Sequence, residues 1–484
     1  MDEQQKVATH KLFINGDWQS ASSEQTFFTH NPATETVLAE VARGDMADVE
    51  QAVVAARHAL EGAWGRLKPK DRSRLLYAAS RVILEHAEEL ALLETLDSGK
   101  PLPQARKEVV STARYFEYYA GAADKIHGEQ IPLGPGFVNF TIREPMGVTA
   151  HIVPWNKPLN ILARSLAPAL AAGNTAVIKP SELTPLTALK LAELLAGMGF
   201  PAGVVNVVTG YGEEAGAALA GHTDIDHITF TGSAATGRAV MKAAAEHIKP
   251  VVLELGGKSP LLVFADADLD VVVREAVKGI ITNCGQMCSA GSRILVETAV
   301  KAPFLEKLTA AMQQIVIGPG VDSPDLGPLV SDIQYGRVAN HIDIATSEGA
   351  HILYGGGRPP HLARGYFIEP TIFDNVLPDM YIAQQEVFGP VLAAITFQDE
   401  AEAVRIANKV PYGLVAGIFT NNINRALRLA TRLQAGQVFI NDFYTGDEET
   451  PFGGYGQSGF GREKGLAALH NYTQIKNVAI RVRA

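Results

Sequence analysis

Short apolar runs that alternate with longer helical patterns dominate the chain from Pro145 onward. Five such runs predict strands, at 148–153, 176–178, 204–208, 227–231 and 251–253. Short apolar strands separated by helices are typical of a parallel sheet with helices on both faces. Because such sheets bind ligands at the carboxyl ends of their strands, we expect function directly after these runs.

The helices between these runs have their own start signals. Thr184-Pro185 predicts a helix to Leu195, with Thr184 as the N-cap and proline at the first position. Further helices are expected after the first strand to about Leu170, from Glu213, and from Ser233 to His247.

A second alternating unit follows the first. Its predicted strands lie at 261–264, 294–296, near 365–373, and at 391–397, 416–420 and 437–440. Helices are expected from Asp268, from Ala302 to Ile315, and between the last three strands. The fold class is therefore α/β, with a Rossmann-like parallel-sheet domain and a second parallel-sheet domain that carries the thiols.

The N-terminal part begins with a strand at Leu12–Trp18 that enters a hairpin at Asn15-Gly16. Asp45 caps a helix to about Leu60, and two further helical runs follow at 71–98 and 104–122. Extended pieces at 138–143 and 478–482 have little core of their own, which predicts an arm that pairs with itself or with another subunit.

These patterns divide the chain into three parts. We expect a cofactor-binding domain from residues 1–122 and 146–255 and a catalytic domain from 256–455. The small β arm is expected from residues 123–145 and 470–484.

Composition narrows the functional classes. The chain has 484 residues, 47% of them hydrophobic, and a formal net charge of -10, which argues against binding to nucleic acid or to an anionic membrane. The longest uncharged run, 194–212, is broken by Pro201 and several glycines, so no membrane span is expected. The polar stretch Met1–Lys6 lacks a signal-peptide core, and two cysteines in so long a chain suggest a reducing compartment, so we expect a cytoplasmic protein.

Both cysteines lie in the stretch Asn283–Arg293, between a helical run and a strand. Cys284 and Cys288 are four residues apart, but no second cysteine pair exists and no histidine lies nearby, so we expect no metal site. Each thiol is then either a nucleophile presented at a cleft or a buried spectator.

Polar residues follow the predicted strands of the first domain. Gly232-Ser233 to Gly237 leaves a strand and opens a helix, where free N–H groups suit a phosphate, although a plain turn explains the pattern equally well. Gly210 opens the preceding helix in a similar way. Lys179 to Glu182 offers a carboxylate that accepts from ribose hydroxyls and repels a 2′-phosphate, or else two surface charges.

Two further strand ends carry reactive groups. Asn156 places an amide donor where it could stabilise an oxyanion. Glu254 ends an apolar strand beside Gly256-Gly257 and is a candidate base with a raised pKa.

Seven segments in order, spread over nearly the whole chain, resemble the signature set of the NAD(P)-dependent aldehyde dehydrogenase superfamily. They are Pro154–Asn156, Lys179–Glu182, Phe230–Ser233, Leu253–Lys258, Gly285–Cys288, Glu386–Pro390 and Pro451–Gly454.

This resemblance implies oxidation of an aldehyde to a carboxylic acid. Cys288 would be the nucleophile, Asn156 and the Cys288 N–H the oxyanion hole, and Glu254 the base that activates water against the thioester. Cys284 would be structural. The expected cofactor is NAD, with NADP as the alternative, held by Val153, Trp155, Lys179, Ser181, Glu182, Gly210, Gly232, Ser233, Gly237, Leu255, Glu386 and Phe388. The arm would join subunits into a dimer or a homotetramer built as a dimer of dimers.

Two positions depart from the usual pattern of the family. Lys157 replaces an aromatic residue after Asn156, and Arg164 stands where relatives that oxidise succinate semialdehyde carry an arginine. A positive charge in the substrate tunnel suits a carboxylate-bearing semialdehyde. Those relatives often carry a second arginine six residues before the nucleophile, however, and this chain has Thr282 at that position. Alternatively, both cations pair with acidic residues at the tunnel mouth: Asp442, Asp447, Glu448 or Glu449. The other expected substrate contacts are Ile161, Met287, Ser289, Tyr444 and Phe452.

Three other functions remain as alternatives. A neutral aliphatic or aromatic aldehyde would need no cation in the tunnel. CoA-acylating oxidation would not need a water-activating base, so Glu254 argues against it. A nucleotide-binding protein without activity would have no use for intact Cys288, Glu254 and Asn156.

Overall fold

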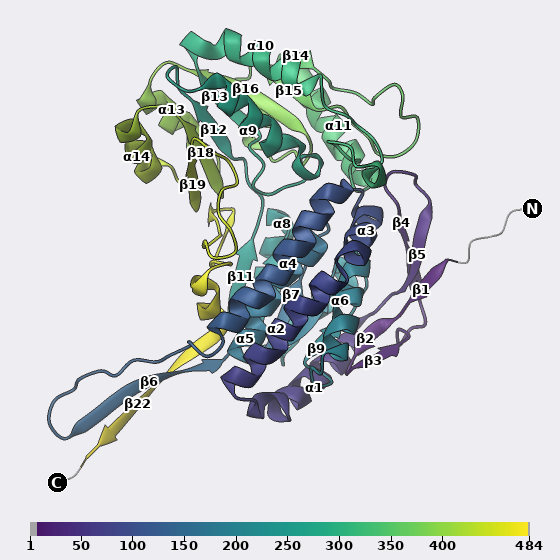
Figure 1. The fold of residues 1–484 in the computed structure, drawn as a ribbon, viewed down its shortest axis with the longest axis vertical. Coiled ribbons are helices and arrows are strands. Elements are labelled where there is room, and N and C mark those ends of the chain that lie inside the picture. Colours follow the sequence, from purple (N-terminus) through teal and green to yellow (C-terminus); the bar gives the residue numbers. More distant parts are fainter. Residues whose placement is uncertain (1–6, 483–484) are drawn as a thin grey trace, which may run out of the picture.

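The computed structural model describes residues 7–482 and divides them mainly between two large sheets and a projecting two-stranded arm (Figure 1). Met1–Lys6, which carry the signal-peptide argument, and the last two residues of the predicted arm lie outside the described residues. Within residues 7–482, no helix combines the length and the apolarity needed to cross a bilayer.

The first large sheet has eight strands in the order β21-β11-β10-β7-β8-β9-β2-β3. Its bounds in chain order are β2 (Leu12–Ile14), β3 (Asp17–Gln19), β7 (Val148–Ile152), β8 (Thr175–Lys179), β9 (Val205–Val207), β10 (His227–Thr231), β11 (Val251–Glu254) and β21 (Gly459–Phe460). Strands β7 to β11 are mutually parallel, which confirms the five predicted strands. The predicted hairpin is also present, since β2 pairs antiparallel with β3 around Asn15-Gly16.

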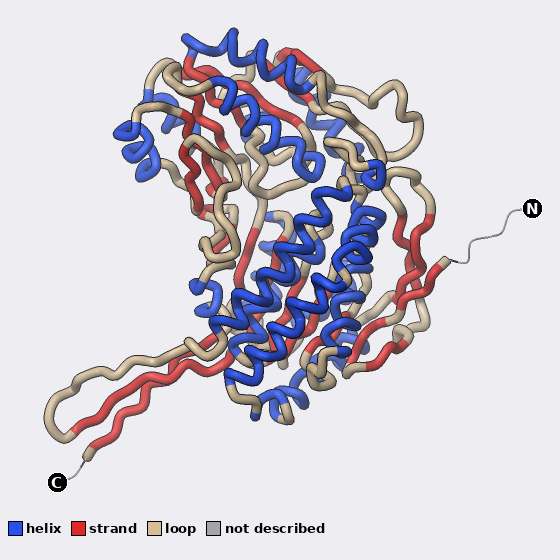
Figure 2. The backbone as a smooth tube through the Cα atoms, in the orientation of Figure 1, coloured by secondary structure: helices blue, strands red, loops and turns tan. Residues whose placement is uncertain are grey.

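Helices cover both faces of this sheet (Figure 2). They are α1 (Met46–Glu61), α2 (Pro69–Glu85), α3 (Ala87–Ser98), α4 (Leu102–Ala122), α5 (Pro158–Ala172), α6 (Leu186–Gly197), α7 (Ala217–Gly221) and α8 (Ala234–Ala245). Successive residues of β8 face opposite cores: Ile178 packs with Leu162 of α5, and Val177 packs with Val53 of α1. Burial of such side chains contributes roughly 1.5–3 kcal/mol each and fixes the strand ends in place.

The second large sheet has seven strands in the order β14-β15-β16-β13-β12-β18-β19. They are β12 (Pro260–Val263), β13 (Arg293–Glu297), β14 (His351–Tyr354), β15 (Thr371–Asp374), β16 (Val391–Phe397), β18 (Val415–Phe419) and β19 (Gln437–Ile440). Only β14 is antiparallel to its neighbour among these strands. The accompanying helices are α9 (Leu269–Ile281), α10 (Lys301–Met312), α11 (Asp332–Ser347), α12 (Tyr381–Gln384), α13 (Glu400–Ala407) and α14 (Ile423–Arg432).

The arm consists of β6 (Phe137–Pro145) and β22 (Thr473–Arg481) and extends away from both sheets (Figure 1). The two strands pair antiparallel along their whole length, from Thr473 opposite Pro145 to Arg481 opposite Phe137. The prediction that the two extended pieces pair with each other is therefore confirmed.

Four predicted helices and strands differ from the structure. The run 71–98 breaks at His86, whose backbone leaves the helical region, so that α2 packs on α4 and α5 while α3 packs on α4 and α6. Thr184 does not cap α6, because its hydroxyl donates to the Trp155 carbonyl at 3.3 Å. The helix predicted from Glu213 is a short π turn followed by the single turn α7, and the strand near 365–373 begins only at Thr371.

Several elements were not predicted from the sequence. A three-stranded sheet joins β1 (Ala8–His10), β5 (Val37–Ala42) and β4 (Thr26–His30) beside the first sheet. Helix α11 and strand β14 were also missed. Strands β17 (Tyr412–Gly413) and β20 (Tyr455–Gly456) form a further two-stranded pair.

Candidate active site

Cys288 lies on a loop that turns sharply after α9. The 3-10 turn Thr282–Gly285 contains two non-glycine residues in the left-handed region, Asn283 with φ 50° and Cys284 with φ 56°. Gly285 continues this path with φ 68°, and a Cβ there would lie 2.2 Å from the Gly389 carbonyl oxygen. The turn buries Cys284 in the core and leaves Cys288 half-buried at a cavity.

This cavity has a volume of about 250 Å³, and it is lined by residues from the domains of both large sheets. Eight residues predicted from the sequence line it: Trp155, Asn156, Gly232, Ser233, Glu254, Cys288, Glu386 and Phe388. Segments far apart in the chain therefore bring a thiol, a carboxylate and an amide donor to one place.

Burial dominates the protonation of the thiol. It raises the pKa of Cys288 to about 12, and nearby Arg164 opposes this while Glu254 adds to it. A thiol so protonated becomes a nucleophile only by giving up its proton as it reacts.

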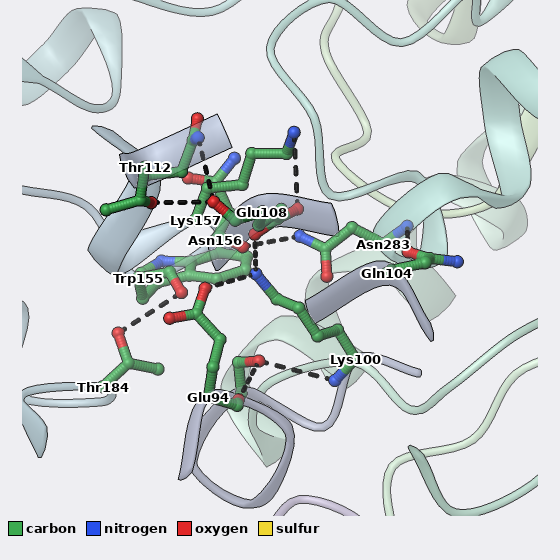
Figure 3. Close-up of polar contacts among 12 residues, drawn as sticks. Glu94, Lys100, Gln104, Glu108, Thr112, Trp155, Asn156, Lys157, Thr184 and Asn283 are labelled. Atoms are coloured by element: carbon green, nitrogen blue, oxygen red, sulfur yellow. Dashed lines mark hydrogen bonds and ion pairs between the residues drawn. The ribbon is translucent and has the colours of Figure 1, made fainter. Parts of the chain in front are cut away.

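Asn156 follows β7 and is buried, with 4% of its surface exposed. Its side-chain Nδ2 donates to the Gln286 carbonyl at 2.8 Å, two residues before Cys288, and its backbone carbonyl accepts from the Asn283 side chain (Figure 3). A primary amide carries two N–H donors, so this bond orients the side chain and leaves one N–H for another acceptor.

Glu254 ends β11 with 1% of its surface exposed. Neither carboxylate oxygen has a hydrogen-bond partner among the described residues. Burial raises the pKa of Glu254 well above its ordinary value, and the nearby Glu463 raises it further. A carboxyl group with these properties suits proton transfer at neutral pH.

Glu386 approaches the cavity from the second sheet. The Gly257 N–H donates to its Oε1 at 2.9 Å, and a Cβ at Gly256 would lie 2.1 Å from its Oε2, so a larger residue there would displace this carboxylate. Burial raises the pKa of Glu386 to about 7. Phe388 packs edge-on against Trp155 with ring centroids 5.2 Å apart.

The start of α8 also lines the cavity. Ser233 caps this helix by accepting the Thr236 N–H at 3.1 Å. Gly232 lies over the Phe230 ring, where a Cβ would lie 2.5 Å from the ring edge. The free N–H groups of a helix start at a cavity favour a bound anion such as a pyrophosphate.

The remaining predicted cofactor residues do not line this cavity. Lys179 ends β8 almost fully buried and forms an ion pair with Glu182, Nζ to Oε2 3.1 Å. A Cβ at Gly237 would lie 2.7 Å from Leu255, so these two residues set how closely α8 approaches β11. Three others hold the backbone near these strand ends: Val153, Ser181 and Gly210.

Arg164 has a different partner from those expected. Its guanidinium forms an ion pair with Glu463, with side-chain exposures of 8% and 1%, and lies 5.2 Å from the Phe452 ring centroid. The acidic residues at the predicted tunnel mouth do not pair with it. Glu463 already neutralises the positive charge of Arg164. This charge is therefore not free to bind the carboxylate of a semialdehyde substrate.

Lys157 also pairs within the protein. Its Nζ lies 3.4 Å from Glu108 Oε1 of α4, and not beside the four acidic residues expected from the sequence.

Three of the predicted substrate residues, Met287, Tyr444 and Phe452, belong to one apolar cluster. Met287 and Tyr444 pack, with Cys288, against a core that contains Phe452. The Tyr444 hydroxyl donates to the Ser289 carbonyl at 3.3 Å, so Ser289 contributes backbone here. Ile161 belongs instead to the core beneath the first sheet.

Three cavity residues were missed, and all come from α11: Gln334, Arg337 and His341. Gln334 donates to the Phe388 carbonyl at 2.8 Å. The cap residue Ser331 and the apolar positions Val338 and Ile342 were the signal for this helix.

Comparisons with known proteins identify the family of the chain. Residues 18–478 match the aldehyde dehydrogenase family. A hydroxyisobutyraldehyde dehydrogenase of Mycolicibacterium austroafricanum is 47% identical over 99% of this chain and 95% of its own. A betaine aldehyde dehydrogenase of Bacillus subtilis is 44% identical over 96% of each chain. An NAD+ complex of aldehyde dehydrogenase from Bacillus cereus superimposes with a TM-score of 0.97 at 45% identity, over 98% of this chain and 97% of that one. The chain belongs to the aldehyde dehydrogenase family.

Proposed function

We propose that this protein oxidises an aldehyde to the carboxylic acid with NAD as the hydride acceptor. One observation carries the proposal: Cys288, Asn156, Glu254 and Glu386 line a single cavity of about 250 Å³. The NAD+ complex of the Bacillus cereus relative supports the choice of cofactor.

Cys288 and Asn156 act first. The thiol gives its proton to solvent water while its sulfur bonds to the aldehyde carbon, and the carbonyl electron pair moves onto oxygen. The free N–H of the Asn156 amide and the Cys288 backbone N–H stabilise this oxyanion, each contributing about 3 kcal/mol to the lowering of the barrier. Hydride loss from the same carbon leaves a thioester on Cys288.

Glu254 acts second. Its carboxylate takes a proton from water as the water oxygen attacks the thioester carbon, and the C–S bond then breaks to release the acid and free the Cys288 sulfur. The lack of hydrogen-bond partners on Glu254 supports this role, since both oxygens remain able to accept.

The cofactor site fits a dinucleotide. NAD supplies the hydride acceptor when bound. Glu386 would hold the nicotinamide ribose, Phe388 would pack at the nicotinamide, and Ser233 with Trp155 would hold the pyrophosphate. Lys179 and Glu182 would hold the adenosine ribose, with Glu182 one-third exposed and able to accept from its hydroxyls.

We propose a neutral aliphatic or aromatic aldehyde as the substrate. The pairing of Arg164 with Glu463 removes the reason to expect a carboxylate on it. The apolar cluster at Met287, Tyr444 and Phe452 favours a neutral tail. Two relatives named for neutral or cationic aldehydes are consistent with this choice.

We also propose that the arm joins subunits into a dimer or a tetramer. Exposed apolar side chains lie on both of its strands: Phe137, Val138, Ile142, Ile475 and Ile480. Such a surface favours a partner. Ile475→Asp should lower the assembled mass in sedimentation, and an unchanged mass would contradict this role.

The predicted domain boundaries stay predictions: 1–122 with 146–255 for the cofactor-binding domain, 256–455 for the catalytic domain, and 123–145 with 470–484 for the arm. The cytoplasmic location also stays a prediction.

The activity is tested by NADH formation with neutral aliphatic, aromatic and ω-carboxylated aldehydes. Turnover with wild type that is lost in Cys288→Ala supports the mechanism, and Glu254→Gln should still give one burst of NADH before it stops. No turnover by the wild type with any aldehyde, with NAD or NADP, would contradict the proposal.

A further inference from the structure

Two side chains of α4 reach the loops that carry the amide donor and the thiol. Gln104 and Glu108 lie four residues apart, so they share one face of this helix. Gln104 Oε1 accepts the Asn283 backbone N–H at 2.8 Å. Glu108 pairs with Lys157, the residue after Asn156 (Figure 3).

Asn283 connects Gln104 to the amide donor. Its backbone is in the left-handed region and 2% of its surface is exposed. Its side-chain Nδ2 donates to the Asn156 carbonyl at 2.8 Å. The position of Asn283 therefore sets the position of the Asn156 backbone.

Further hydrogen bonds join the loop after β7, which carries Asn156, to the loop that carries Asn283 and Cys288. The Asn156 side chain donates to the Gln286 carbonyl, and Gln286 Nε2 donates back to the Asn283 carbonyl at 3.0 Å. Two hydrogen bonds thus link the loop after β7 to the loop before Cys288, and a third, from Gln286 to Asn283, holds the second loop in shape. A displacement of Asn283 would move the amide and the thiol relative to each other.

Helix α4 is firmly anchored where it makes these contacts. Glu108 Oε2 lies 2.5 Å from Lys100 Nζ, which also bonds Glu94 Oε1 at 2.7 Å (Figure 3). Lys100 and Glu94 are almost wholly buried, so this ion-pair network is shielded from solvent. The helix face therefore provides a rigid support.

We propose that Gln104 is a positioning residue for the oxyanion hole. It holds Asn283, and through Asn283 it sets the Asn156 amide relative to Cys288, while Glu108 supports the same loop through Lys157. The inference rests on the proposed role of Asn156. Oxyanion stabilisation requires donors that are in place before reaction, and a shift of about 1 Å can cost about 100-fold in rate.

A double-mutant cycle tests this role in the full-length enzyme, with the single-turnover rate of NADH formation as the readout. Gln104→Ala should lower that rate about 10-fold and leave the KM for NAD within about twofold. In the Asn156→Ala background the same change should have almost no further effect, because its target is already gone. Gln104→Glu keeps an acceptor oxygen and should recover most of the rate.

Lys107→Ala is the matched control, since Lys107 is exposed on the same helix, and its rate should equal that of wild type. Gln104→Ala with an unchanged rate would overturn the inference. So would an equal loss in both backgrounds, or a Gln104→Glu variant as slow as Gln104→Ala, because either result indicates a general effect on folding. A wild-type rate in Asn156→Ala would instead overturn the proposed role of Asn156 itself, and the inference with it.

Discussion

Arg164 on α5 forms an ion pair with Glu463, and both side chains are buried close to Glu254. The two charges act on Glu254 in opposite directions: Glu463 raises the pKa of Glu254, and Arg164 lowers it. The protonation of the proposed base therefore depends on the balance between these two buried charges.

Glu463→Gln should shift the pH dependence of turnover. It removes a negative charge that raises the pKa of Glu254 and leaves Arg164, which lowers it, so Glu254 should lose its proton at lower pH. The acid limb of the kcat–pH profile should move to lower pH, in an assay where thioester hydrolysis limits the rate.

Glu306→Gln is the control for this variant, because Glu306 is exposed and has no ion-pair partner among the described residues. A Glu463→Gln profile that matches wild type, or moves to higher pH, would show that Glu463 does not act on the base.

Arg164 illustrates what local spacing predicts and what it does not. Its place on a helix after Asn156 followed from the predicted helix that runs to about Leu170, and α5 confirms that helix. Its partner could not be predicted, because Glu463 comes from a loop near the far end of the chain that meets α5 only in the folded protein. The pairing of Arg164 with Glu463 therefore could not be predicted from local spacing, and the role of Arg164 toward the substrate stays a prediction.

The strand ends were easier to predict. Short apolar strands must be buried on both faces, so their bounds at β7, β10 and β11 followed from hydrophobicity alone. The turn at Asn283 and Cys284 was harder, since two left-handed residues in succession have no simple sequence signal. The N-terminal strands β4 and β5 were missed because charged and polar residues interrupt their apolar positions.

The two cysteines should react very differently. Burial raises the pKa of Cys288 to about 12, so its alkylation by iodoacetamide should speed up about tenfold per pH unit from about pH 7 to 10. Cys284 lies 1% exposed in the core and should stay unmodified in the folded enzyme. Mass spectrometry of the labelled peptide distinguishes the two thiols.

Cys288→Ser should lose aldehyde oxidation, whereas Cys284→Ser should retain most of it. Inactivation that follows labelling of Cys284 would contradict the assignment of Cys288 as the nucleophile.

Glu182→Gln should widen the choice of cofactor. The carboxylate pairs with Lys179 and would repel the 2′-phosphate of NADP. Removing this charge also frees the Lys179 ammonium, so kcat/KM with NADP should rise about 10-fold, the equivalent of roughly 1.4 kcal/mol.

The matched control is Glu193→Gln, an exposed carboxylate on α6 that pairs with Lys190. A Glu182→Gln enzyme with an unchanged ratio of NADP to NAD efficiency would show that another residue selects the cofactor.

His151 and His227 are buried around Tyr472, which directly precedes the arm strand β22. Thr149 and Ser165 lie 2.9 Å from the two ring nitrogens of His151, and Thr229 lies 3.2 Å from Nε2 of His227. Burial lowers the pKa of His151 to about 3 and that of His227 to about 4. Both rings are therefore neutral in the folded protein.

This cluster should make the fold sensitive to mild acid. Below the ordinary pKa of 6.5 the unfolded chain takes up protons that the folded chain does not, so the stability present above pH 6.5 is lost as pH falls. Each histidine should lower the free energy of unfolding by about 1.4 kcal/mol for each pH unit below 6.5. Urea denaturation at pH 7.5 and at about pH 5.5 measures this loss of stability. The loss should be smaller in His227→Asn than in the control His58→Asn, which changes an exposed histidine. Because Tyr472 leads into β22, equal pH dependence in both variants would show that acid acts elsewhere than at the base of the arm.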